Sequence, residues 1–182
     1  MNPTESDTQA APSGLSGTDM AFIGLMGALL IFVAWLTTVN YQEGMKTEAA
    51  KSNGEAWVEW LTEAGTQRFS ADFKPAVCAG GPASDSTWGP CFAHLQSDTT
   101  LGKLVNTFFD KPPHFITQCD KGNRSTTGAI VLENLVATPA GSAIPFVIKP
   151  LEASDSIEGK IQIRVTVCDK GGYPIKIGEL EF

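Results

Sequence analysis

One stretch of the sequence, Met20–Val39 (MAFIGLMGALLIFVAWLTTV), decides the fold class because it is long, apolar and free of charged residues. As an α-helix its 20 residues would span roughly 30 Å, which is the thickness of the hydrocarbon core of a bilayer. A domain of this size rarely buries a helix that is apolar on every side. The stretch therefore predicts a transmembrane helix over residues 20–39.

The flanks of this stretch favour an uncleaved anchor over a secretory signal peptide. A signal peptide has a basic segment before a short apolar core and a small-residue cleavage site after it. Residues 1–19 contain no Lys or Arg, and the apolar run continues directly into Asn40-Tyr41-Gln42-Glu43. Because residues 1–19 are rich in Pro, Ser, Thr, Gly and Ala, they predict a flexible tail.

Small residues within the apolar stretch indicate a face that packs against another helix. Gly24 and Ala28 are four residues apart, and Gly27 lies beside them. Small side chains let two helix backbones approach closely in lipid. These three residues predict a helix partner in the membrane, with the alternative that Gly and Ala are simply common in membrane helices.

The helical pattern continues over residues 40–65 and becomes amphipathic. Four apolar residues there recur at helical spacing: Trp57, Trp60, Leu61 and Ala64. This stripe predicts a helical extension that packs on a sheet formed later in the chain. Gly65 is expected to end the helix, because glycine adopts the left-handed conformation that helix termini often need.

Residues 66–182 predict a small α+β domain. Gly80-Gly81-Pro82 and Gly89-Pro90 are strong helix and strand breakers, which predict a loop over residues 74–98. Apolar residues at helical spacing after Asp98 predict a short helix that ends at Pro112.

From residue 114 onward the chain predicts an antiparallel β-sheet. In residues 160–169 apolar and polar side chains alternate, as in a strand with one buried face. The alternation changes parity after Gly178, which predicts a β-bulge there. The expected strands are His114–Cys119, Ala129–Val136, Pro145–Leu151, Lys160–Asp169 and Tyr173–Phe182.

All four cysteines lie in this domain, and their positions predict two disulfides. Cys78 and Cys91 flank the predicted loop. Cys119 and Cys168 each begin the tetrapeptide Cys-Asp-Lys-Gly and each close a predicted strand, so the two strand ends are expected to be neighbours. Three pairings are possible, and we expect Cys78–Cys91 with Cys119–Cys168.

Two signals disagree about the side of the membrane on which residues 66–182 lie. All 13 Lys and Arg residues follow the apolar stretch, and basic residues accumulate on the cytoplasmic side. Close to the membrane, however, acidic residues offset Lys46 and Lys51. Four cysteines without a CxxC pair are typical of disulfides in an oxidising compartment. We therefore expect an extracytoplasmic domain, in the periplasm or at the cell surface; the alternative is reduced thiols in the cytoplasm.

Composition and motifs exclude several function classes. The net charge of −7 argues against nucleic acid as a partner, because phosphate binding needs clustered Lys and Arg. Two His residues and scattered cysteines predict no metal site. The sequence contains no phosphate-binding glycine loop, GxSxG or HExxH motif, so we expect no cofactor and no enzymatic activity.

The order of elements resembles that of type IV pilins and pseudopilins. In that family an N-terminal helix inserts in the membrane and later packs in a filament core, while a head domain wraps a sheet against the other half of the helix. Family members are cleaved after a Gly that follows basic residues, and a Glu stands five residues further on. Here Gly17 follows an acidic leader, and Phe22 occupies the fifth position after it. The resemblance implies a filament subunit.

These features together predict a non-enzymatic, single-pass subunit that assembles through its N-terminal helix into a larger membrane complex. Its expected partners are membrane lipid and other membrane or filament subunits, including further copies of itself. One alternative is a pilin-like filament subunit. Another is a membrane-tethered binding module that uses residues 79–90 or Trp88, and a third is an anchored enzyme with a pocket at His94 or His114.

Overall fold

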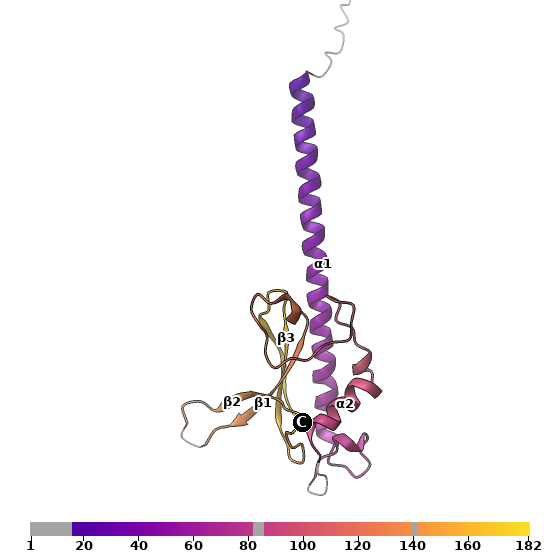
Figure 1. Ribbon diagram of the computed structural model, residues 1–182, viewed down its shortest axis with the longest axis vertical. Helices are drawn as coiled ribbons and strands as arrows, with labels where there is room; N and C mark the ends of the chain where they lie inside the picture. Colours follow the sequence, from indigo (N-terminus) through magenta and orange to yellow (C-terminus); the bar gives the residue numbers. More distant parts are fainter. Residues whose placement is uncertain (1–15, 82–85, 140–141) are drawn as a thin grey trace, which may run out of the picture. The chain divides into compact units, whose positions relative to one another are not determined.

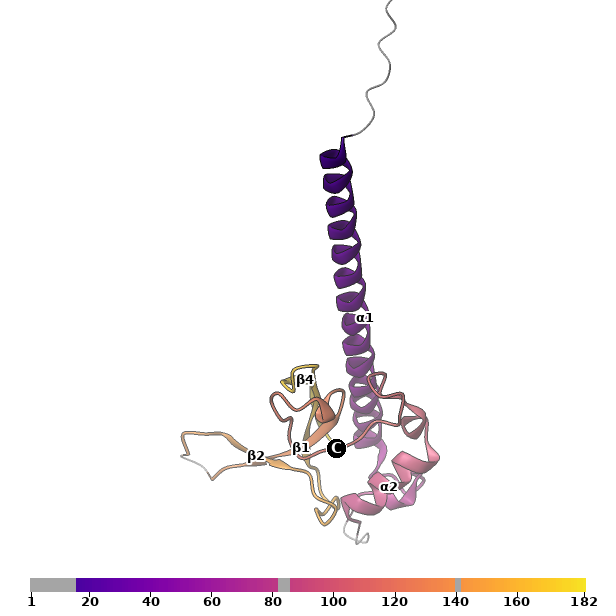
Figure 2. The same cartoon turned by 45° about the horizontal axis from the view of Figure 1, so that its top comes forward.

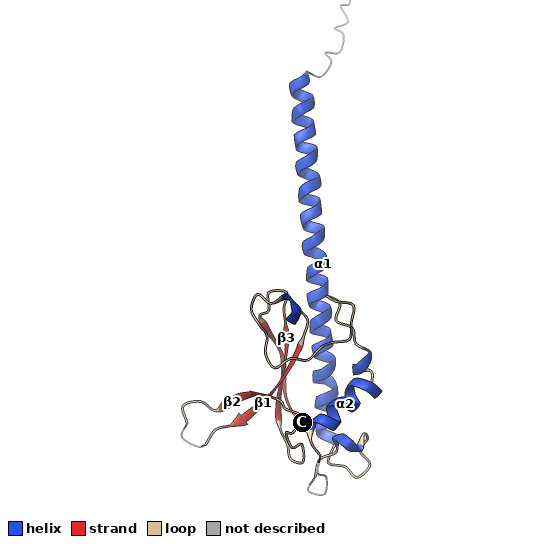
Figure 3. Ribbon diagram, in the orientation of Figure 1, coloured by secondary structure: helices blue, strands red, loops and turns tan. Residues whose placement is uncertain are grey.

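The computed structural model describes residues 16–81, 86–139 and 142–182 and has the predicted α+β architecture (Figure 3). The chain divides into two compact units, Met1–Gln42 and Glu43–Phe182. The main elements are α1 (Gly17–Gln67), α2 (Trp88–Asp98), β1 (Ile130–Ala137), β2 (Phe146–Pro150), β3 (Gln162–Cys168) and β4 (Pro174–Glu181). Residues 1–15 of the predicted tail lie outside the described residues.

Helix α1 begins three residues earlier than predicted because Ser16 and Asp19 cap it. The Asp19 backbone N–H donates to Ser16 Oγ at 3.2 Å, and the Ser16 N–H donates to Asp19 Oδ2 at 3.0 Å. This reciprocal arrangement satisfies backbone donors that the first turn of a helix leaves without partners. The helix then continues through the apolar stretch without interruption to Gln67.

Helix α1 does not end at Gly65 but continues to Gln67. Gly65 packs closely against the backbone of Glu181 instead of ending the helix. A Cβ atom at Gly65 would lie 2.3 Å from the backbone oxygen of Glu181. Gly54 has a similar role, since a Cβ there would lie 2.8 Å from Val167 Cγ2. Both glycines let α1 approach β3 and β4 more closely than any other residue would allow.

The four strands form one antiparallel sheet in the order β2-β1-β3-β4. The register between β3 and β4 shifts where Val165 pairs with Gly178 and Thr166 pairs with Lys176, which places a bulge at the predicted position. Ile163, Val165 and Val167 of β3 are buried against α1, as strand alternation predicts. Figures 1 and 2 show α1 between the sheet and α2.

The predicted stripe of α1 supplies the centre of the core. Trp57, Leu61 and Ala64 are buried, while Trp60 is partly buried and packs against Phe182. The Trp57 ring meets Phe115 edge-on at 5.0 Å between centroids, which is a favourable geometry for aromatic pairs. The domain is therefore built around the second half of α1.

The β1–β2 hairpin projects from the domain (Figure 1). Every residue of β2 is exposed, whereas Ile130 and Val131 of β1 are buried. The exposed large apolar residues of this hairpin are Val136, Ile144, Phe146, Val147 and Ile148.

Three further local predictions were wrong. Residues 88–98 form α2 instead of loop, because Pro90 falls in the first turn, where a helix needs no backbone N–H donor. The helix expected after Asp98 is reduced to a 3₁₀ turn at Leu101–Lys103. The strand expected at His114–Cys119 is only an isolated bridge between Phe115 and Ile130.

The lost helix after Asp98 has a clear physical cause in the buried side chain of Asn106. Its Nδ2 donates to the backbone oxygen of Thr127 at 2.9 Å, and its Oδ1 accepts from the backbone N–H of Phe108 at 3.0 Å. Asparagine side chains that bond to the backbone compete with helix formation. Asn106 therefore holds residues 104–111 as an irregular segment against the start of β1.

Candidate functional site

The apolar half of α1 is the most distinctive surface of the molecule. It is long and apolar enough to cross a membrane, and no residue of its most apolar part is buried. Gly24 and Ala28 are exposed, and no atom lies within 4 Å of a Cβ built at Gly24 or Gly27. The three small residues lie on a helix surface that is open in this single chain, so their role in helix packing stays a prediction.

Two disulfides hold the domain formed by Glu43–Phe182. Cys78 pairs with Cys91 at a Cα–Cα distance of 4.7 Å, and Cys119 pairs with Cys168 at 5.5 Å. This is the pairing that the repeated tetrapeptide predicts. The first bond ties residues 76–78 to α2, and the second ties the segment before β1 to the end of β3.

The Cys119–Cys168 bond also closes a small second core on the sheet face opposite α1. Ala129, Val131 and Cys168 are buried there, and Ile116 packs against them. Because residues 116–119 cover this face without forming a strand, the disulfide takes over the anchoring that a strand's backbone hydrogen bonds would provide. The second core explains why both sheet faces are apolar at this end.

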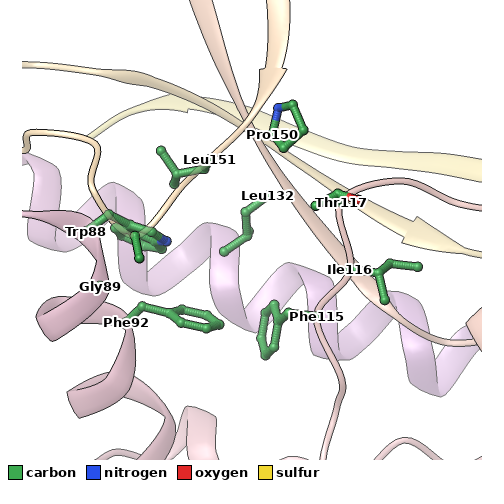
Figure 4. Close-up of a pocket in the computed structure, with 10 residues that line it drawn as sticks. Trp88, Gly89, Phe92, Phe115, Ile116, Thr117, Leu132, Pro150 and Leu151 are labelled. Carbon is green, nitrogen blue, oxygen red and sulfur yellow. The ribbon is translucent and has the colours of Figure 1, made fainter.

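An apolar cavity of about 230 Å³ opens beside α2, and Trp88 forms one wall of it (Figure 4). Trp88 is buried and packs against the rings of Phe92 and Phe182. Figure 4 shows its indole nitrogen directed toward Leu132, within the group of residues that line the cavity. The lining is mostly apolar, so the cavity can accept an apolar group. Residues 82–85 of the predicted binding loop lie outside the described residues.

The two histidines lie in different parts of the domain. His114 lines an open hollow with Lys111 and Ser125, but Ser125 Oγ donates to Asn123 Oδ1 at 2.7 Å. His94 lies on α2, in a different part of the domain. Within residues 16–81, 86–139 and 142–182, no three His, Cys, Asp or Glu side chains gather closely enough to hold a metal ion.

Arg68 is the residue that sequence reasoning missed. Its side chain is fully buried, and its Nη2 donates to the backbone oxygens of Ile157 and Gly159. The guanidinium also lies 4.8 Å from the ring centroid of Phe69. Burial lowers the pKa of Arg68 to about 10, so the side chain remains protonated at neutral pH. No hydropathy pattern marks it, because a single Arg after an amphipathic helix is normally exposed.

Comparison with protein-family models, with curated proteins and with solved structures found no match for this chain.

Proposed function

We propose that this protein is a non-enzymatic, single-pass membrane subunit that assembles through its N-terminal helix into a larger complex and carries an extracytoplasmic head. The observation that supports it best is that one chain combines an exposed apolar helix with a disulfide-bonded domain. Residues 17–42 are an apolar helix with exposed sides, and residues 43–182 form a domain with its own core and two disulfides.

Membrane anchoring is supported by the exposed side chains of α1. Leu25, Leu30 and Ile31 are each more than 60 % exposed, and apolar residues surround the helix on all sides. Burial of one such side chain is favourable by about 1.5–3 kcal/mol, so a dozen exposed in water would be a large cost. Lipid covers such a surface without any protein partner.

The extracytoplasmic side is supported by the state of the cysteines. All four are paired, and none is free. Disulfides persist in oxidising compartments and are rare where glutathione and thioredoxin keep thiols reduced. The measurement is the mass of the full chain, extracted from membranes without reductant after free thiols have been blocked. No added blocking groups are expected, whereas four would place the head in the cytoplasm.

Assembly through the helix is supported by Gly24, Gly27 and Ala28. Their small side chains would let the backbone of a second helix approach α1 closely. The test is the double variant Gly24→Leu/Ala28→Leu, compared with Met26→Leu/Leu30→Ile on another side of the helix. Native mass spectrometry from mild detergent should show loss of the complex for the first variant only. If the first variant keeps its full assembly, docking through this surface is wrong.

A filament subunit is the second candidate, and the layout of the chain favours it. One continuous helix of 51 residues carries an apolar first half, and its second half packs on an antiparallel sheet. Loss of about the first 17 residues in the mass of the native chain, together with filaments in electron micrographs, would support this candidate over an unprocessed subunit.

A further inference from the structure

One end of the domain formed by Glu43–Phe182 combines cations with exposed apolar side chains. We call it the basic face. Its cations are Lys46, Lys111, Lys121, Arg124 and Lys170, and its exposed apolar residues are Val105, Phe109 and Tyr173. These residues come from α1, the irregular segment after α2, the turn before β1 and the β3–β4 turn.

Hydrogen bonds and an ion pair bring these four segments together. Thr107 Oγ1 donates to the backbone oxygen of Lys46 at 3.3 Å, which joins the irregular segment to α1. The Gly122 N–H donates to the Gly171 oxygen at 2.9 Å, which joins the two turns. An ion pair between Lys170 and Glu43 joins the β3–β4 turn to α1. The basic face is therefore one continuous surface.

A cavity of about 240 Å³ lies within the basic face, and three cations line it: Lys46, Arg124 and Lys170. Phe108 and Phe109 form an aromatic part of its wall, and Glu43 is its one acidic residue. Since Glu43 is paired with Lys170, it leaves Lys46 and Arg124 without an ion-pair partner in the described parts of the chain. The cavity thus has an excess of positive charge and offers ammonium and guanidinium donors, which suit phosphate.

The acidic residues around the cavity are largely engaged by the protein itself. Asp169 Oδ1 accepts hydrogen bonds from the backbone N–H groups of Gly171 and Tyr173, both at 2.7 Å. Asp120 Oδ2 accepts from Asn123 Nδ2 at 3.0 Å. Asp110 is exposed at the edge. Asp120 and Asp169 thus bond to neutral donors, and neither forms an ion pair with a cation of the cavity among the described residues.

One cation of the cavity, Lys46, follows the membrane segment closely in the sequence. Lys46 follows Val39, the last residue of the apolar stretch, by seven residues. At the rise of an α-helix this is about 10 Å. The headgroup layer is about 5–8 Å thick on each side of the hydrocarbon core, so Lys46 lies within reach of lipid phosphates.

The exposed apolar residues fit the same surroundings. Phe109 is 41 % exposed, Val105 46 % and Tyr173 49 %. Contact of these apolar side chains with water is unfavourable. Aromatic residues concentrate at membrane interfaces, where the ring contacts acyl chains and polar groups contact headgroups. Cations beside exposed aromatics are the usual composition of a surface that lies on a bilayer.

We propose that the basic face binds anionic phospholipid headgroups of the bilayer that holds α1, with phosphate in the cavity lined by Lys46, Arg124 and Lys170. The inference rests on the proposed membrane anchoring. It adds a second contact, which fixes how the head lies on the membrane surface. Lipid composition then controls the orientation of the head.

The experiment uses the full chain in nanodiscs of phosphatidylcholine alone or of phosphatidylcholine with phosphatidylglycerol at about 3:1. Amide hydrogen exchange is measured over residues 104–111 and 169–173 by mass spectrometry. Exchange is expected to be several-fold slower with the anionic lipid, because each cation near an anionic surface contributes about a fivefold preference. Equal exchange in the two lipids would overturn the proposal.

Matched charge variants connect any protection to the cavity. Lys46→Gln/Arg124→Gln/Lys170→Gln should abolish the difference between lipids, whereas Lys74→Gln/Lys103→Gln/Lys149→Gln, with three exposed lysines elsewhere, should keep it. If both triple variants keep it, the cavity is not the site. If the first variant fails to fold, a salt titration of the unmodified chain decides, because protection that persists at about 0.5 M salt is not electrostatic.

A separate measurement distinguishes failure of this inference from failure of the anchor. Alkaline carbonate removes proteins bound to the membrane surface and leaves spanning ones in place. A chain that resists carbonate but shows equal exchange in both lipids keeps the anchor and overturns the basic face. A chain that carbonate releases overturns both.

Discussion

The guanidinium of Arg68 lies 4.3 Å from the ring centroid of Phe182. Arg68 directly follows α1, and Phe182 directly follows β4. Arg68 is buried with this ring, and its Nη2 holds the backbone of Ile157 and Gly159. One side chain therefore fastens three distant parts of the chain. Its Nε and Nη1 have no hydrogen-bond partner among the described residues.

Arg68→Ala should lower the free energy of unfolding by about 2–4 kcal/mol, because it opens a cavity and leaves two backbone oxygens without donors. Arg68→Met should cost less, since methionine fills much of the volume and removes a buried charge. Denaturant unfolding in detergent, followed by tryptophan fluorescence, measures both. A larger loss for Met than for Ala would contradict this account of the site.

Replacing Cys119 and Cys168 together by Ala should cost about 4 kcal/mol, because the bond closes a segment of 49 residues. The same change at Cys78 and Cys91, which are 13 residues apart, should cost about 3 kcal/mol. Unfolding curves of the two double variants give the comparison. A smaller loss for the pair that closes the longer segment would mean that chain entropy does not set the order of the two losses.

Gly65→Ala should destabilise the domain by about 1–3 kcal/mol, because the added methyl group would meet the backbone of Glu181. Gly44→Ala is the matched control, since α1 also contains Gly44 and nothing lies within 4 Å of a Cβ there. Alanine is favoured in a helix, so this control should be neutral or stabilising by up to about 1 kcal/mol. The midpoints of thermal unfolding report both changes, and equal shifts would contradict the close contact.

The Glu179 carboxylate should make the stability of β4 depend on pH. Lys176 and Arg164 lie 3.0 and 2.7 Å from its Oε1, and their hydrogen bonds lower the pKa of Glu179 below its usual 4.5. Its stabilising contribution is therefore complete above pH 4.5 and is lost as the pH falls through the lowered folded-state value. Glu179→Gln should melt slightly below the unmodified chain at pH 7, and the gap should vanish once the pH lies below the lowered pKa of Glu179. A gap that stays constant with pH would exclude this carboxylate as its source.

The elements that the sequence predicts well are those in which one residue pattern has one physical explanation. The uncharged stretch, the stripe at Trp57 and Leu61 and the alternation in β3 each bury or expose a whole face, so periodicity is sufficient. The pairing of Cys119 with Cys168 followed from the repeated tetrapeptide.

The elements that the sequence predicts poorly depend on single contacts between distant residues. Pro90 is tolerated in α2 because it lies in the first turn, and Asn106 prevents a helix because Thr127 accepts its hydrogen bond. Gly65 faces the backbone of Glu181, which no local pattern indicates. The basic face was missed for the same reason, since its cations come from four segments.

The contact between Gly65 and the backbone of Glu181 has a consequence for biogenesis. The two residues are far apart in the chain, so the surface on which α1 packs exists only after β4 has been synthesised and, in the proposed topology, has crossed the membrane. During that interval Trp57 and Leu61 would be unprotected on a tethered helix, where they are open to proteases and to wrong partners. In the proposed topology, export of the head should therefore depend on a holding chaperone more strongly than export of a domain that folds from its first residues onward.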